Sequence, residues 1–220
     1  MMRESKIRRI HKLNGTAHMI VGASTGFAVA YAMQADPTTT IMFVGLGGVT
    51  ALIPDMDTDG KLSNKITFSY KFARATLQLM GVLILLYSFL EHANVMRWIG
   101  VGLGVGVIIL ASFLTQRMML TLTGIGVVAA GIYIEENWIL LLGVYMILAS
   151  FVAHRSYTHS IIGVLFFGII AYQFEASVGI EGMFLTCMLG YISHLITDMK
   201  VFPFNKRGVR WFLPFSKKEF

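Results

Sequence analysis

Charged residues are scarce in this chain. Only 14% of its 220 residues are Asp, Glu, Lys or Arg, while 55% are apolar, and the mean hydropathy is +0.68. Soluble domains typically carry about 25% charged residues. The composition therefore excludes an ordinary soluble domain and predicts a polytopic membrane protein.

Cysteine is almost missing as well. The single cysteine, Cys187, lies inside the last apolar run, which excludes a disulfide framework and a thiolate metal site. Any bound metal must then be held by nitrogen and oxygen ligands. Internal repeats and low-complexity segments are also absent from the sequence, so we expect one domain over residues 1–220.

Long apolar runs are what the chain does contain. Eight of them are candidate membrane spans, near residues 16–35, 39–54, 74–91, 95–115, 118–134, 137–153, 160–176 and 182–197. They predict an all-α fold, a membrane bundle of about eight transmembrane helices. A basic start followed by an apolar run is also typical of a secretory signal peptide, but a convincing small-x-small cleavage site is missing and the run is long.

The basic residues are unevenly distributed over this topology. With a cytoplasmic N-terminus, all Lys and Arg residues except Arg97 fall on the cytoplasmic side, as the positive-inside rule requires, and both termini are then cytoplasmic. The net charge of +6 could suggest a nucleic-acid partner, but the distribution of the basic residues is the better evidence, and no nucleic acid is expected. Residues 1–15 read as a basic segment at the membrane surface, and residues 199–220 as an aromatic and basic tail that can cover a site.

Two histidines and an arginine stand between two of the apolar runs. His154 and His159 are five positions apart, which places them about 140° apart on one continuous helix. They can share a metal only if the helix breaks between them, and Ser156 and Tyr157 are the expected break. Arg155 lies beside them, where it can either neutralise a phosphate or anchor to lipid headgroups.

Further candidate ligands fall on the same membrane face. His194 and Asp198 are four positions apart and share one helix face, Asp55 and Asp57 follow a proline, and His18 opens the first span. The predicted metal ligands are His18, Asp55, Asp57, His154, His159, His194 and Asp198. Seven such ligands exceed one tetrahedral site and suit two divalent ions, with Zn²⁺ favoured and Mn²⁺ or Fe²⁺ open.

A two-metal centre of this kind is suited to hydrolysis. Two ions about 4 Å apart can clamp a phosphate and activate a water molecule, so we expect Asp57, His159 and Arg155 to be the catalytic residues. Thr16, Thr158 and Ser160 fit supporting hydrogen bonds or helix caps better than a nucleophile. The alternative is that these polar residues only decorate helix ends, but ionisable residues in membrane segments are usually functional.

Four stretches of the chain carry a family resemblance. They are Gly15–His18, Pro54–Asp57, His154–Ser160 and His194–Asp198, and together they resemble the YdjM-type family of membrane-bound metal-dependent hydrolases. The tail segment Gly208–Phe215 is similar to the ending common in that family. The resemblance implies a multi-pass protein of the bacterial inner membrane with a cytoplasm-facing phosphoesterase site, remotely similar to zinc phospholipases C and P1-type nucleases.

We therefore predict a metal-dependent hydrolase that acts on a lipid or prenyl phosphate at the cytoplasmic membrane face. Its expected partners are membrane lipids and the lipid-phosphate substrate. Two other functions remain open: a metal-ion or proton-coupled transporter, and a non-catalytic scaffold with a structural metal. Transporter sites usually lie near the bilayer midplane between repeated halves, whereas these ligands gather at one face.

Overall fold

The regular structure of the described residues is entirely helical. The computed structural model describes residues 15–56, 67, 69–91, 94–153, 156–201 and 208–220. Its helices are α1 (Gly15–Ala32), α2 (Pro37–Thr50), α4 (Tyr70–Glu91), α5 (Asn94–Ser112), α6 (Gln116–Tyr133), α7 (Asn137–Phe151), α8 (Ile161–Val178) and α9 (Met183–Thr197), with short 3₁₀ turns η1 (Ile53–Met56) and η2 (Tyr157–His159).

Each apolar run of the sequence overlaps one of these α-helices. The helices α4, α5 and α8 are long and apolar enough to cross a membrane, while α7 and α9 are shorter apolar helices. The expectation of about eight crossings remains a prediction. One boundary was wrong: α4 begins at Tyr70, four residues before the predicted span 74–91. In the second turn of this helix, the Arg74 guanidinium donates to the carbonyl oxygen of Leu114 at 2.6 Å.

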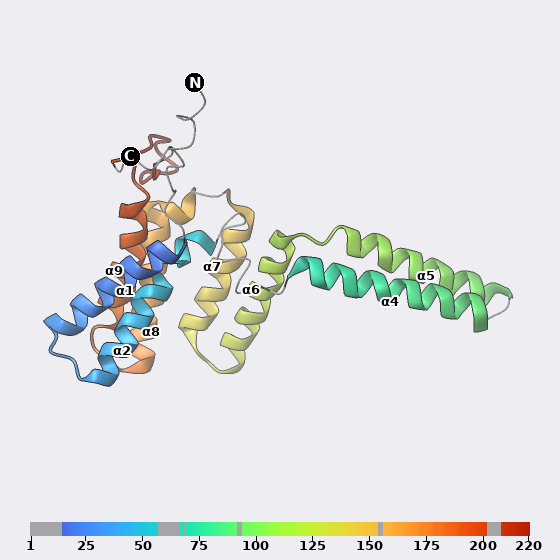
Figure 1. Ribbon diagram of the computed structural model, residues 1–220, viewed down its shortest axis with the longest axis horizontal. Coiled ribbons are helices and arrows are strands. Elements are labelled where there is room, and N and C mark those ends of the chain that lie inside the picture. The colour runs from blue at the N-terminus through green and yellow to red at the C-terminus, as the bar shows by residue number, and fades with distance from the viewer. Residues whose placement is uncertain (1–14, 57–66, 68, 92–93, 154–155, 202–207) are drawn as a thin grey trace, which may run out of the picture.

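The helices are arranged as hairpins. The α1–α2, α6–α7 and α8–α9 hairpins have their turns at one end of the molecule, and the C-terminal tail lies at the other end (Figure 1). The helix α9 packs against α1, α2 and α8, and α8 packs against α7. The main core lies among α7, α8 and α9, where Tyr145, Phe167, Tyr191 and Leu195 are buried.

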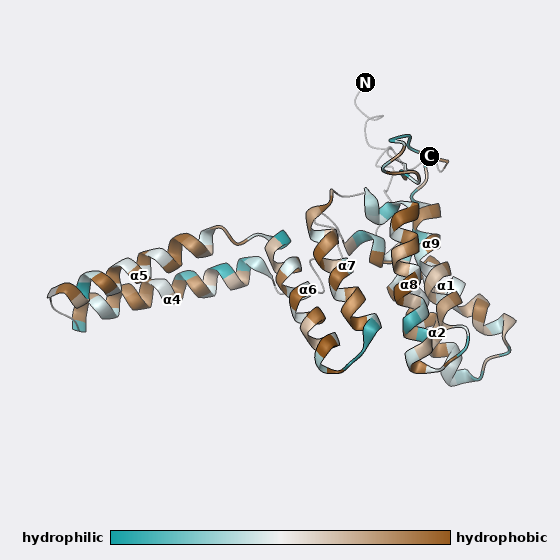
Figure 2. Ribbon diagram, turned by 180° about the vertical axis from the view of Figure 1, so that it is seen from behind, coloured by the Kyte–Doolittle hydropathy of each residue, from teal (hydrophilic) through white to brown (hydrophobic). Residues whose placement is uncertain are grey.

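The α4–α5 hairpin departs from the single bundle that we expected. It extends away from the other helices (Figure 1), and apolar residues run along both of its helices (Figure 2). Side chains such as Leu83, Trp98 and Leu103 are more than half exposed. Lipid tails are as apolar as these side chains, so the hydrophobic effect does not drive such helices to pack on the remaining helices.

Glycines bring α1, α2 and α9 into close contact. A Cβ atom on Gly22 would lie 2.3 Å from the carbonyl oxygen of Gly47, and one on Gly190 would lie 2.6 Å from the same oxygen. Only glycine allows backbones to approach this closely. His18 lies one turn before Gly22, and His194 lies one turn after Gly190. The contact therefore determines how far apart these two histidines are.

The tail folds back onto the start of α8. Val209 is fully buried in the main core, and the amide of Ile161 donates to the carbonyl oxygen of Trp211 at 2.9 Å. Val209 and Phe220 exchange two backbone hydrogen bonds. This supports the expectation that the tail lies near the site, because Ile161 follows η2 by only two residues.

We predict that Gly22→Leu separates α1 from α2. The added side chain meets backbone and the Cβ of Ala51, and overpacking of this kind costs about 1–3 kcal/mol. The expected result is a lower melting temperature in detergent and a loss of bound metal. Gly45→Leu is the matched control, because a Cβ on Gly45 meets nothing within 4 Å. Equal destabilisation by both variants would contradict the proposed role of the contact.

We also predict that the docking of the tail depends on Glu219. Its carboxylate lies 3.0 Å from both Lys200 Nζ and Arg210 Nη2, and hydrogen bonds from Lys200 and then Arg210 lower the pKa of Glu219 to about 2. Because the folded pKa is depressed, the stabilisation is complete above the unfolded pKa of about 4.3. It is lost as the pH falls from there toward 2.

A spin label reports this change. Phe215→Cys places the label at a residue that is 94% exposed, and the natural Cys187 is buried. The label should keep the same mobility between pH 5 and pH 8 and become more mobile in Glu219→Gln at neutral pH. Glu181→Gln, in the exposed α8–α9 turn, should leave the label unchanged. A mobility transition near pH 7 would show that another group controls the tail.

Candidate metal centre

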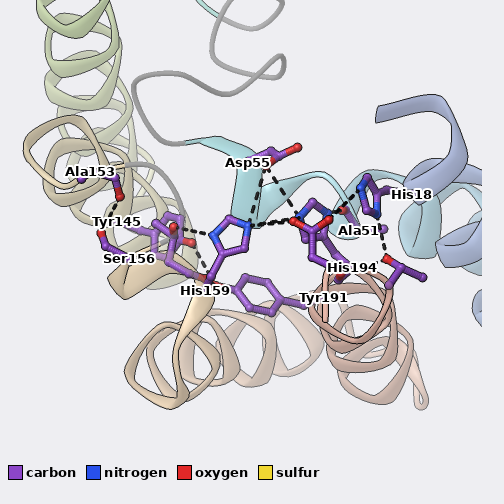
Figure 3. Close-up of polar contacts among 12 residues, drawn as sticks. His18, Ala51, Asp55, Tyr145, Ala153, Ser156, His159, Tyr191 and His194 are labelled. Carbon is purple, nitrogen blue, oxygen red and sulfur yellow. Dashed lines mark hydrogen bonds and ion pairs between the residues drawn. The ribbon is translucent and has the colours of Figure 1, made fainter. Parts of the chain in front are cut away.

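The structure brings together five of the seven predicted ligands. They come from four separate elements: His18 from α1, Asp55 from η1, His159 from η2, and His194 with Asp198 from the end of α9 (Figure 3). The other predicted site residues, Asp57, His154 and Arg155, lie outside the described residues. Segments up to 180 residues apart in the chain therefore meet at one end of the helices.

Two carboxylate oxygens approach the same pair of imidazole nitrogens. The Nε2 atoms of His159 and His194 are 3.2 Å apart. Asp55 Oδ1 lies 3.8 and 3.7 Å from these two nitrogens, and Asp198 Oδ2 lies 3.8 Å from each of them. Ligands at about 2.0–2.2 Å from a tetrahedral Zn²⁺ are about 3.3–3.6 Å from one another. The donor set and its spacing therefore fit a divalent transition metal.

The second carboxylate oxygen of Asp198 faces a different histidine. Asp198 Oδ1 lies 3.6 Å from His18 Nε2, while Oδ2 faces His159 and His194. The His18 ring stacks on the His194 ring with centroids 4.1 Å apart. His18, His194 and Asp198 thus form a second group of possible ligands that shares residues with the first. A carboxylate in this position can bridge two adjacent ions.

The outer nitrogen of His194 defines its tautomer. Its Nδ1 lies 2.7 Å from the carbonyl oxygen of Ala51, and a carbonyl oxygen can only accept a hydrogen bond. The Nδ1 atom therefore carries the hydrogen, which leaves the lone pair on Nε2, the atom that lies near His159 and Asp55. Such an outer contact is how proteins orient a histidine ligand.

The same reasoning applies to His18. Its Nδ1 lies 2.8 Å from Thr197 Oγ1, and this hydroxyl donates to the backbone carbonyls of Ser193 and His194 at 2.9 Å. Since the hydroxyl hydrogen is used there, Thr197 accepts from His18 Nδ1. Nε2 of His18 is left with its lone pair toward Asp198. His159 Nδ1 has a comparable partner in Thr158 Oγ1 at 3.0 Å.

Burial makes a charge on these ligands costly unless it is compensated. His159 and His194 are fully buried, and Asp198 is 2% exposed. The side chain of Asp55 is 16% exposed, so it marks the accessible edge of the cluster. A buried carboxylate needs a compensating positive charge, and a divalent ion among these donors would supply it.

The helix break predicted before His159 is confirmed, although it is wider than expected. The helix α7 ends at Phe151 and α8 begins at Ile161, and η2 between them carries His159. Thr158 has the supporting role that was predicted. Ser160 occupies the N-cap position of α8, but its hydroxyl bonds to Tyr157 instead of capping the helix.

Two supporting groups were missed in the sequence. Thr197 lies beside the predicted ligands His194 and Asp198 at the same helix end, and this position could have identified it as a supporting residue. The Ala51 carbonyl carried no signal, because a backbone oxygen at the end of a helix is not visible in side-chain patterns.

A family model matches most of the chain. The model of the YdjM inner membrane protein family matches residues 13–220. The chain belongs to the YdjM inner membrane protein family. The match covers all five clustered ligands of this YdjM family member, as well as its tail. No curated protein and no solved structure matches the chain.

We predict that the protein purifies with a divalent transition metal and that Asp198→Asn loses it. Asn keeps the shape of the side chain but removes the carboxylate charge that faces His18 on one side and His159 and His194 on the other. Thr197→Val should weaken metal binding by about 10–100-fold, as loss of an outer hydrogen bond typically does. Elemental analysis and competition with a chelator measure both effects.

The control for this experiment is Asp36→Asn. Asp36 is an exposed carboxylate that caps α2 at the opposite end of the helices, and hydrogen bonds from Thr39 lower its pKa. Its replacement should leave the metal content unchanged. Metal-free wild-type protein that stays metal-free after incubation with Zn²⁺ or Mn²⁺ would count against the centre.

Proposed function

We propose that this protein is a metal-dependent hydrolase that cleaves a phosphoester of a lipid or prenyl phosphate at the cytoplasmic face of the inner membrane. The observation that carries the proposal is the cluster of three imidazoles and two carboxylates at metal-ligand spacing. Membership in an inner membrane protein family supports a substrate that resides in the same membrane.

The chemistry follows from the donor set. His18, Asp55, His159, His194 and Asp198 would hold a divalent ion here, and such an ion would supply the activated water of metal-assisted hydrolysis. The chain's own residues provide a rigid frame for that step. Thr158, Thr197 and the Ala51 carbonyl hold the three imidazole rings in place, and fixed ligands reduce the reorganisation needed during reaction.

Access to the centre is at Asp55. The side chain of Asp55 is the most exposed of the five, and it belongs to η1 rather than to a long helix. We propose that the phosphate approaches over Asp55, that Asp57 completes the ligand set, and that Arg155 binds the phosphate. The proposal includes two ions, and Asp198 would belong to the residues that hold them because its two oxygens face different histidines.

The proposed membrane orientation follows from charge. Four basic residues of the described tail region, Lys200, Arg210, Lys217 and Lys218, lie at the same end as the ligands. The opposite turns carry Asp36, Glu135, Glu136 and Glu181. This asymmetry supports eight crossings with the centre and both termini in the cytoplasm. The position of the ligands at one end of the helices argues against a transporter, whose site would be expected near the midplane.

The test is phosphate release from lipid phosphates in detergent or liposomes. Phosphatidic acid, a polyprenyl phosphate and a polyprenyl diphosphate form a suitable panel. At least one should be hydrolysed by protein loaded with Zn²⁺ or Mn²⁺, and chelation should stop the reaction. Since loss of an outer contact alone costs about 10–100-fold, Asp55→Asn should reduce turnover by about 100-fold or more.

Asp36→Asn provides the comparison for this variant. It removes one carboxylate charge from the opposite end of the helices, so turnover should be unchanged. If the metal-loaded protein releases phosphate from none of the lipids in the panel, the proposal is wrong. Full turnover by Asp55→Asn would remove Asp55 from the site.

A further inference from the structure

An apolar groove runs between α7 and α8. Its empty volume is about 360 Å³, part of which is open to the outside. The floor includes Ala149 and Gly163, and the rim includes Leu148, Tyr157 and Ile162. Ala149 is 2% exposed, whereas Leu148 and Ile162 are 52% and 43% exposed. The groove therefore has a deep floor of small residues between two raised apolar edges.

Thr158 connects the groove to the candidate metal centre. It belongs to the lining, and its hydroxyl contacts Nδ1 of His159. Its carbonyl oxygen accepts a hydrogen bond from Tyr191, whose hydroxyl lies 3.1 Å from that of Tyr145. Figure 3 shows Tyr145 on one side of His159 and the ligands His194 and Asp55 on the other side. The groove and the centre are thus separated by the single turn η2.

The position of the groove along the helices gives it a direction. Its α7 residues belong to the last turns of that helix, and its α8 residues belong to the first turns. One end of the groove is therefore at η2, beside the ligands, and the groove runs from there along two apolar helices. Of these, α8 is long and apolar enough to cross a membrane.

This lining restricts the chemistry of an occupant. A polar ligand would lose its hydrogen bonds to water against such a surface, at a high cost in free energy. A hydrocarbon chain has no such groups to satisfy. Because the surrounding lipid is equally apolar, binding gains little from the hydrophobic effect; its benefit is the positioning of the polar group at the end of the chain.

We propose that this groove binds one hydrocarbon chain of a lipid whose terminal phosphate reaches the metal centre around η2. The inference rests on the proposed function and adds the part of the substrate that is recognised away from the phosphate. The shared chemistry is a long hydrocarbon chain that ends in a phosphoester. An acyl chain of phosphatidic acid and the chain of a polyprenyl phosphate both have it.

Photocrosslinking tests the groove without requiring turnover. The full-length protein is placed in liposomes with phosphatidic acid that carries a diazirine in its acyl chain, or with a polyprenyl phosphate that carries one in its chain. Labelling is measured by peptide mass spectrometry with and without chelator. For at least one probe, we expect labels concentrated on residues 145–166 and competition by the same lipid without the diazirine.

Filling the groove should remove this labelling. Ile162→Trp and Leu148→Trp add bulk from opposite rims, and overpacking should reduce labelling of the groove by about fivefold or more. Leu165→Trp is the matched control, because Leu165 is 63% exposed on the same helix but does not line the groove. Each variant should retain its metal, which shows that the centre is intact.

The outcomes separate this inference from the proposed function. Concentrated labelling that both filling variants abolish supports the groove, even if no lipid is hydrolysed. Labels spread evenly over the apolar helices, or unchanged in Ile162→Trp and Leu148→Trp, would mean that bulk lipid alone covers this face. That result would overturn the inference while leaving chelator-sensitive turnover as a separate measurement. Labelling by only one of the two probes identifies which lipid supplies the chain.

Discussion

The close contact of α1, α2 and α9 is the constraint on which the candidate centre depends. Gly22, Gly47 and Gly190 let three backbones approach to distances that any larger residue would prevent. One helical turn away, the rings of His18 and His194 stack at 4.1 Å, and the end of α2 brings the Ala51 carbonyl onto His194. Metal–ligand distances tolerate deviations of only about 0.2 Å. The backbone packing of these helices must therefore be accurate for the ligands to be correctly placed.

The centre is built from helix ends and 3₁₀ turns. Backbone carbonyls are available only there, because carbonyls inside a helix are used by its own hydrogen bonds. Asp55 in η1 and His159 in η2 come from such irregular segments, while Asp198 follows the last turn of α9. Polar groups therefore collect at one end of the molecule, and the apolar groove begins on the other side of η2. A phosphate head and a hydrocarbon chain require this pairing of surfaces.

The helices and the ligands were predictable because each has a local signature. Apolar runs of nearly twenty residues identify helices without tertiary information, and His194 with Asp198 lie on one helix face by spacing alone. The arrangement of α4 and α5 was not predictable. Their apolar surfaces satisfy the same hydrophobic pattern whether they face lipid or other helices, so the pattern does not determine that this hairpin extends away from the others (Figure 1).

The sequence by itself determined the helical class, the likeness to a membrane protein family and the identity of five residues that meet in space. Tertiary structure decided how they meet: which oxygen of Asp198 faces which imidazole, which tautomer His194 adopts, and that Thr197 supports His18. The reason is physical. Residue type and spacing fix what a side chain can bind and on which helix face it lies, whereas distances between helices depend on backbone contacts among segments that are far apart in the chain.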